Sequence, residues 1–278
     1  MNNNLAIYDT GVGGLSIMQE LLKHLPSINI IYFDDSGFFP MGNKSFIQIQ
    51  ERLKQVCRYL FDNCGVNLIV LGCNTATVTS IRELQLRWLA TEFPSQGKNI
   101  IGISTPITEQ IIEKYWHLRD EPGMIISTSA TFRTGFYQAE FLKYGFRNFL
   151  AVPSTNLATG VQLRDPLKIQ LAIDETFEPF LNNLSNIKIL ILACTHYHWV
   201  ENLIKSKFSL ETKIINPGEV VARKLIEYID RHPEYKIDFQ SKLQLLTTGI
   251  PEVVKTTNEY FLHKEMIVYK VDNTIFSV

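Results

Sequence analysis

Two cysteines that each end an apolar run are the side chains in this sequence most suited to chemistry. Cys73 ends the run in VLGCNTAT, and Cys194 ends the run in ILACTHYH, where His196 follows two positions later. If the chain stays extended through Cys194, its side chain and that of His196 point to the same side, because side chains alternate along a strand. A neighbouring imidazole can accept the thiol proton or stabilise the thiolate, which lowers the cysteine pKa. The pattern predicts reactive thiols, although either cysteine taken alone is also typical of a packed core.

Further polar residues stand at the ends of other apolar runs. Asp9 and Thr10 occur in YDTGVGGLS, before glycines that allow a tight turn into a helix, and Asn74 and Thr75 follow Cys73 directly. Amide and hydroxyl groups supply neutral donors and acceptors that suit a carboxylate or an amine. The glycine spacing is not G-x-G-x-x-G, because position 16 is serine, so a dinucleotide site is not favoured.

Short apolar runs alternate with longer amphipathic stretches along the chain. Continuously apolar runs are typical of strands covered on both faces, and alternation with helices indicates a parallel α/β sheet. Ligands of such sheets bind beyond the carboxyl ends of the strands, where the polar residues above are expected. The expected strands are 5–9, 28–35, 67–73, 99–104, 123–128, 149–154, 187–194 and 212–217.

The similar endings Cys-Asn-Thr and Cys-Thr-His indicate two related halves. We predict an α/β fold with two similar parallel-sheet, three-layer domains that face each other across a substrate cleft. Polar stretches near 91–98 and 206–213 mark the boundaries. The first domain is expected to comprise 1–97 and 211–278, and the second 98–210. The last segment has the pattern strand, helix, strand, and is expected to return to the first domain.

Composition excludes several classes of protein. The 278 residues include 27 basic and 28 acidic side chains, which gives a net charge of −1 and no basic surface for nucleic acid or an anionic membrane. There is no uninterrupted apolar run of about 18 residues and no evident secretory signal. The four cysteines have no zinc-ribbon spacing, and Cys57 and Cys64 lie at helical spacing typical of packing. We expect a cytoplasmic protein with reduced thiols and a small-molecule ligand.

Several segments together resemble one family. IYDTGVGGLS, YFDDSGFFPMGNKS, VLGCNTAT, STSATFRTGFY, LACTHYHWV and NPGEVVA resemble, in order and spacing, the glutamate racemase family of the aspartate/glutamate racemase superfamily, over nearly the whole chain. The resemblance implies an isomerase that needs no cofactor and interconverts L- and D-glutamate, for peptidoglycan synthesis and hence cell-wall biogenesis and cell shape. It also implies that the amino-acid substrate lies between the two domains, and it is compatible with a homodimer.

The resemblance also implies roles for particular residues. Racemisation removes a proton from one face of Cα and returns one to the other, so it needs an acid–base group on each side. Cys73 and Cys194 would be these groups, one of them a thiolate before substrate binds, with Asp9 assisting the first and His196 the second. Because a carboxylate raises the pKa of a nearby thiol, Asp9 would pair with the substrate ammonium or take the thiol proton. Substrate binding falls to Thr10, Pro40, Met41, Gly42, Asn74, Thr75, Thr128 and Thr195.

Departures from the family pattern concern specificity. The family loop GDTARVPYGTKS is here DDSGFFPMGNKS, with Met41 for tyrosine and Asn43 for threonine, and a glutamate expected after VPSTNLATG is absent, with Gly160 or Gln162 in that area. A racemase acting on another or a broader range of amino acids is one alternative, and a non-catalytic amino-acid-binding protein is another. A zinc site formed by both cysteines with Asp9 and His196 is a third, although the spacing is not typical of zinc sites.

Overall fold

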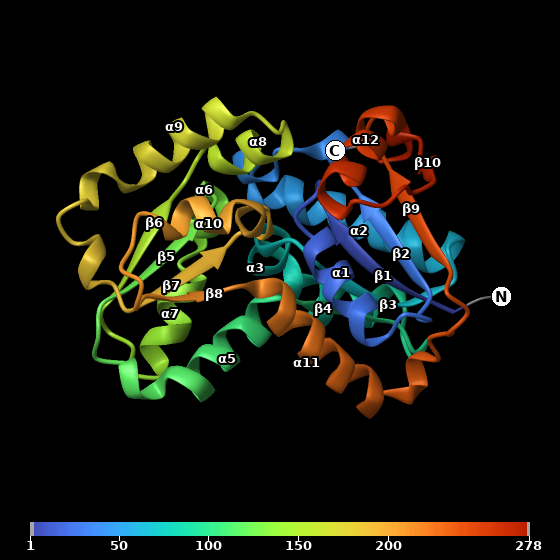
Figure 1. Ribbon diagram of the computed structural model, residues 1–278. Coiled ribbons are helices and arrows are strands. Elements are labelled where there is room, and N and C mark those ends of the chain that lie inside the picture. The colour runs from blue at the N-terminus through green and yellow to red at the C-terminus, as the bar shows by residue number, and fades with distance from the viewer. Residues whose placement is uncertain (1–2, 277–278) are drawn as a thin grey trace.

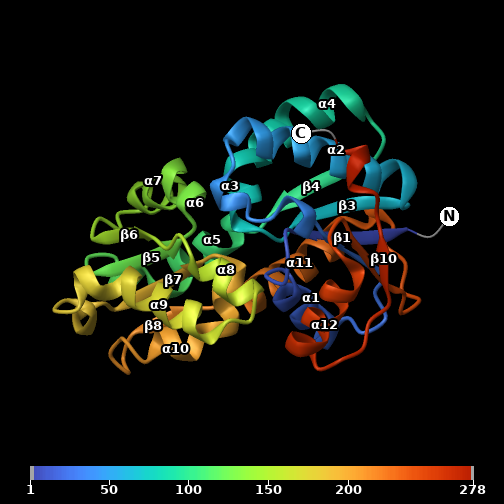
Figure 2. The same cartoon turned by 90° about the horizontal axis from the view of Figure 1, so that it is seen from above.

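A computed structural model describes residues 3–276 and contains two parallel β-sheets, each covered by helices on both faces (Figures 1 and 2). The larger sheet has the strand order β10-β9-β2-β1-β3-β4, and all its neighbouring strands are parallel. Its strands are β1 (Asn4–Asp9), β2 (Ile30–Asp34), β3 (Val66–Leu71), β4 (Asn99–Gly102), β9 (Leu243–Thr247) and β10 (Val268–Lys270).

The smaller sheet has the order β6-β5-β7-β8 and is also parallel throughout. Its strands are β5 (Gly123–Ser127), β6 (Phe149–Pro153), β7 (Ile189–Ala193) and β8 (Lys213–Ile215). Every expected strand is present, and its bounds differ from the expected range only at the ends, with β1 and β3 each starting one residue earlier than expected. The predicted fold class of two parallel α/β sheets is therefore confirmed.

The chain passes between the sheets at places that differ slightly from the expected boundaries. β4 pairs with β3 in the larger sheet, although residues 98–210 were assigned to the second domain, and β8 pairs with β7 in the smaller sheet. β9 pairs with β2, as expected for a C-terminal segment that returns to the first sheet. Composition marks where polar linkers lie but not which sheet the next strand joins. We keep the two-domain division as a proposal, with its boundaries moved to follow β4 and β8.

The helices begin and end at recognisable sequence signals. Ser45 caps α2 in a capping box with Gln48, and prolines occupy the first turn of α9, α11 and α12. Cys57 is buried in α2 and Cys64 ends it, as the packing interpretation predicted. The helices are α1 (Leu15–His24), α2 (Phe46–Asn63), α3 (Asn74–Glu83), α4 (Leu89–Glu92), α5 (Ser104–Tyr115), α6 (Ser129–Thr134), α7 (Phe136–Lys143), α8 (Leu157–Gln162), α9 (Pro166–Phe177), α10 (Glu201–Lys205), α11 (Pro217–Arg231) and α12 (Pro251–Leu262).

The core lies on both faces of the larger sheet. Leu5 and Ile7 of β1 pack on one face in a cluster that continues into the smaller sheet, whereas Ala6 and Tyr8 pack on the other face against α2. Burial on both faces explains why the strands are continuously apolar. Within residues 3–276, the helices are all too short or too polar to cross a membrane.

Candidate active site

Cys73 lies beyond the carboxyl end of β3, at the position immediately before α3. It is buried, and the backbone N–H groups of Thr75 and Ala76 face its sulfur. Free N–H groups at the start of a helix favour a negative charge on such an atom. The thiol is therefore held by the rigid end of a strand and faces donors that would stabilise its thiolate.

Cys194 has the same local arrangement in the smaller sheet. It follows β7, precedes a 3-10 helix (Thr195–Val200), and its sulfur faces the backbone N–H groups of His196 and Tyr197. In both cases the donors lie two and three residues after the cysteine. The two halves thus present matching thiol sites, as the similar sequence endings suggested.

Both thiols line one small cavity of about 30 Å³, which is room for about two water molecules. Residues that follow β1, β2, β3, β5, β6 and β7 all contribute to its wall, so the carboxyl ends of both sheets face it. Ten of the expected site residues line it: Thr10, Pro40, Met41, Gly42, Cys73, Asn74, Thr75, Thr128, Cys194 and His196. Ser129, Thr155, Ala158 and Thr159 line it too, although the sequence analysis did not single them out. Thr155 follows the end of β6, and its place after an expected strand is the sequence feature that could have identified it as a cavity residue.

Asp9 and Thr195, the other expected residues, lie beside the cavity and contact each other. Thr195 Oγ1 donates to Asp9 Oδ2 at 3.0 Å, and the backbone N–H of Thr10 donates to Asp9 Oδ1 at 2.6 Å. Asp9 is fully buried, and this burial raises its pKa to about 8. The carboxyl group can therefore gain or lose a proton near neutral pH.

Burial dominates the ionisation of both thiols. It raises the Cys194 pKa to about 12 and the Cys73 pKa well above its ordinary value, and the charge of Asp9 raises the Cys73 pKa further. The direction of the Asp9 effect on Cys73 is the one that the sequence analysis expected. In the empty site, removal from water opposes the expected thiolate more than the N–H donors favour it, and which thiol ionises when substrate binds stays a prediction.

His196 lies in the 3-10 helix rather than in an extended strand, so the alternation argument fails there. β7 ends at Ala193, and the turn that follows still brings His196 to the cavity wall, with its ring 5.7 Å from that of Phe39. Burial lowers the His196 pKa to about 4. The imidazole is therefore neutral at physiological pH and does not lower the thiol pKa by its charge.

Gln162, at the end of α8, holds His196 in place. Its Oε1 lies 3.0 Å from His196 Nε2 and accepts the backbone N–H of Val12 at 3.0 Å. Because an amide oxygen only accepts, Nε2 carries the imidazole proton and Nδ1 is free to accept one. A Cβ on Gly11 would lie 2.2 Å from Oε1, so the close contact between the Gln162 side chain and the backbone at position 11 requires glycine there. Of the two positions left open by the sequence, Gln162 and not Gly160 therefore contacts the histidine.

Changing Gln162 to glutamate should raise the pKa of His196 by one unit or more. A carboxylate within hydrogen-bond distance of Nε2 would favour the imidazolium, with shifts of about 1–3 pH units typical of such pairs. The titration of the His196 ring protons by NMR measures this shift. Gln162→Leu removes the acceptor without adding charge and is the matched control. An unchanged His196 titration in the glutamate variant would show that the contact does not persist in solution.

Hydrogen bonds join the two halves around the cavity. Thr75 Oγ1 lies 2.9 Å from Thr128 Oγ1, Tyr137 donates to the side-chain oxygen of Asn74, and Trp199 Nε1 donates to Val12 O at 3.0 Å. Asn74 Nδ2 is buried and has no partner among the described residues. A buried donor without a partner in the cavity wall is available to an acceptor on a ligand.

Two further observations delimit the site. A larger cavity of about 460 Å³ lies between α3, α5, α7 and α11, but the described residues that line it include no cysteine or histidine. Within residues 3–276, no group of three or more His, Cys, Asp or Glu side chains is arranged to hold a metal ion. The small cavity is therefore the place where thiol chemistry is concentrated.

Comparison with known proteins identifies the family of the chain. No family model matches the chain. A glutamate racemase from Phenylobacterium zucineum is 30% identical over 274 residues, which cover 92% of this chain and 96% of the relative. The chain belongs to the glutamate racemase family.

Solved structures support the same fold. The chain resembles a glutamate racemase isoform from Bacillus anthracis with a TM-score of 0.83 and 23% identity, over 98% of both chains. It resembles the Francisella tularensis glutamate racemase, solved in complex with D-glutamate, with a TM-score of 0.80 and 24% identity, again over 98% of both chains. The family resemblance seen in the sequence is confirmed over nearly the full length.

Proposed function

We propose that this protein interconverts L- and D-glutamate by proton transfer between Cα and two thiols, without a cofactor. The observation that carries the proposal is the presence of Cys73 and Cys194, from different sheets, in the wall of one cavity. One thiolate would take the proton from Cα of the substrate, and the planar carbanion that this leaves would take a proton from the thiol on the opposite face. In the cytoplasm, the product D-glutamate would serve peptidoglycan synthesis.

The wall of the cavity supports an amino acid as the ligand. Among the described residues, its lining includes no lysine or arginine, so carboxylates would be bound by neutral donors such as Asn74 Nδ2 and the hydroxyls of Thr75 and Thr128. A hydrogen bond from a neutral donor to a charged acceptor is stronger than one between neutral groups. The substrate ammonium would lower the pKa of whichever thiol it approaches, which offsets the effect of burial.

The size of the cavity implies movement during the cycle. An amino acid does not fit in about 30 Å³, so the substrate would enter when the two sheets move apart. The contacts that open would include the Thr75–Thr128 and Thr195–Asp9 hydrogen bonds, which join the halves next to the cavity. Closure around the substrate would then exclude water from the reacting thiols.

The loop after β2 favours a second candidate, a racemase with a broader amino-acid range. Phe39 and Met41 both line the cavity, and Met41 is nearly fully buried. An apolar wall is suited to a less polar side chain than that of glutamate. The two candidate functions use the same two thiols and differ only in the substrate side chain that this loop would contact.

The purified protein should racemise L-glutamate without an added cofactor. Chiral chromatography of L-glutamate, L-aspartate and a panel of apolar amino acids tests this directly. Glutamate as the best substrate supports the first proposal, and a preference for an apolar amino acid supports the second. Binding by calorimetry with no conversion of any amino acid would instead identify a non-catalytic binding protein.

Light scattering of the same sample tests a homodimer, which we also propose from the family resemblance.

A further inference from the structure

A second carboxyl group lies beside Asp9 and has no role in the chemistry described so far. Asp34 ends β2, and in the parallel register of the two strands it is the direct partner of Asp9 at the end of β1. Partner residues of parallel strands project from the same face of the sheet. Tyr32, two residues earlier on β2, reaches that face, since its hydroxyl donates to Gly11 O at 2.6 Å. The two carboxyl groups are therefore neighbours at the carboxyl edge of the sheet.

Among the described residues, only one of the two carboxylate oxygens of Asp34 has hydrogen-bond partners. Its Oδ1 accepts the backbone N–H of Ser36 at 2.9 Å and, at 3.4 Å, the hydroxyl of Thr247. Its Oδ2 is buried and has no hydrogen-bond partner among the described residues, and the residue is only 1% exposed. A buried carboxylate oxygen without a donor is rare, because water would otherwise solvate it. This atom therefore needs an explanation.

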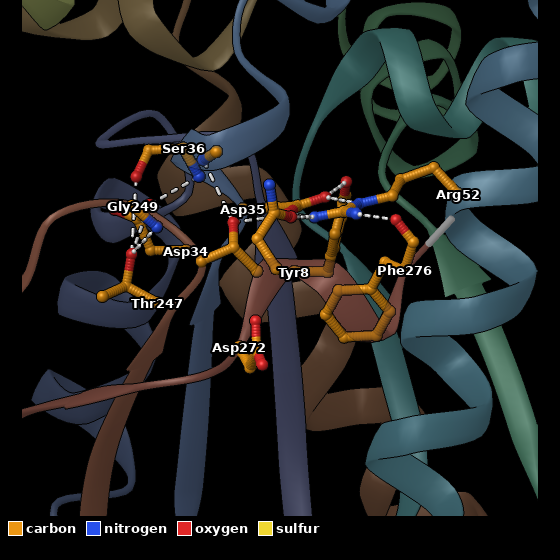
Figure 3. Close-up of polar contacts among 12 residues, drawn as sticks. Tyr8, Asp34, Asp35, Ser36, Arg52, Thr247, Gly249, Asp272 and Phe276 are labelled. Atoms are coloured by element: carbon orange, nitrogen blue, oxygen red, sulfur yellow. Dashed lines mark hydrogen bonds and ion pairs between the residues drawn. The ribbon is translucent and has the colours of Figure 1, made fainter. Parts of the chain in front are cut away.

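The guanidinium of Arg52 is bound by the neighbouring carboxylate, that of Asp35. Figure 3 shows Arg52 in contact with Asp35, whereas Asp34 lies on the side of Ser36 and Thr247. Consecutive residues at the end of a strand point to opposite faces, which separates Asp34 from the Arg52 guanidinium. The charge of Asp34 is thus not neutralised by a bound partner, and it acts on its own face of the sheet.

We propose that Asp34 is a positioning residue for proton transfer, whose charge adds to the effect of burial in favouring the neutral, proton-carrying form of the neighbouring Asp9 when the site is empty. The role in proton transfer rests on the proposed racemase activity, whereas the effect of Asp34 on Asp9 can be tested in the free protein without activity. The titratable or charged groups that face this pair from the surrounding elements are Tyr32 of β2, Cys73 after β3, Cys194 and His196 after β7, and the Asp35–Arg52 pair across the backbone. Thr247, from β9, carries no charge.

The order of ionisation supports this role. Burial raises the pKa of Asp34 to about 6 and that of Asp9 to about 8, and the charge of Asp34 is one cause of the rise at Asp9. The group with the lower pKa loses its proton first, so at neutral pH Asp34 is charged and Asp9 is neutral. Asp9 can then release a proton when a substrate ammonium arrives, instead of acting as a permanent counter-charge.

Asp34→Asn tests the inference, because it removes the charge and keeps an oxygen for Ser36 and Thr247. The pKa of Asp9 should fall by about 0.5–1 pH unit, since a like charge nearby disfavours ionisation. The ¹³C carboxyl titration of Asp9 in the free protein measures the shift without reference to activity. The limb of the pH–kcat/KM profile that reports Asp9 in the free protein should move to lower pH by the same amount.

Asp120→Asn is the matched control, because it removes one exposed acidic charge from a residue that does not line the cavity and should leave the Asp9 titration in place. An Asp9 titration that does not move in Asp34→Asn, or moves equally in both variants, overturns the inference. A shifted Asp9 titration in a protein that racemises no amino acid would support the coupling while refuting the proposed function. A lower kcat with an unmoved pH profile would mean that Asp34 is only structural.

Discussion

Replacing Cys73 or Cys194 by alanine should lower glutamate racemisation by about 10²- to 10⁴-fold or more, in both directions, because each thiol serves one face of Cα. Loss of either group leaves one face with no acid or base, so the two single variants should be affected to a similar extent. The double variant should be little worse than either single one, since residues that act as a unit are strongly non-additive. Initial rates from pure L- and pure D-glutamate measure the effect.

Cys64→Ala is the control for these variants. Cys64 ends α2 away from the cavity, so its loss should leave the rate close to that of the unchanged protein. Serine in place of either cavity cysteine should also be strongly impaired, because a hydroxyl is far harder to ionise than a thiol. Near-normal racemisation by either single alanine variant would rule out a two-thiol mechanism.

Arg52→Ala should lower the free energy of unfolding by about 3–5 kcal/mol, the usual result of leaving a buried charge without its partner. Arg52 and Asp35 are 2% and 0% exposed, and Nε and Nη2 of the guanidinium bind the two carboxylate oxygens at 2.9 and 2.5 Å. The hydroxyls of Tyr8 and Thr248 also donate to this carboxylate, at 2.9 and 2.7 Å. The pair therefore ties α2 to β1, β2 and the end of β9, as Figure 3 shows in part.

Urea unfolding followed by circular dichroism measures the loss. Arg58→Ala is the control, because the Arg58–Glu92 pair is exposed and should contribute less than about 1 kcal/mol. A loss below about 1 kcal/mol in Arg52→Ala would mean that water reaches Asp35 in solution. Asp35 stands at the start of the loop after β2, which carries Pro40, Met41 and Gly42.

Much of the fold and the two thiols could be predicted from local sequence pattern. Continuously apolar runs marked the strands, and a parallel sheet brings polar residues at strand ends to one edge. The same reasoning placed Cys73 and Cys194 at equivalent points of two similar halves. These inferences need only the periodicity of the chain and the rule that ligands bind at the carboxyl edge.

The rest depends on tertiary structure. Gln162 meets Val12 across 150 positions of sequence, and no local pattern indicates such a contact. The partnership of Asp9 with Asp34 depends on which strand lies beside β1 and in which register. Burial sets the pKa of the thiols and of His196, so the expected thiolate could not be tested without the packing around it.

The most direct test of two thiols on opposite faces is the distribution of deuterium when L-glutamate reacts in D₂O. At early times, we expect every molecule of D-glutamate to carry deuterium at Cα, while the remaining L-glutamate keeps its protium. The thiol that returns the proton has exchanged with solvent, and the proton removed by the other thiol is not delivered to the opposite face. D-glutamate that retains the original protium would contradict the account, because it would require a single group to serve both faces.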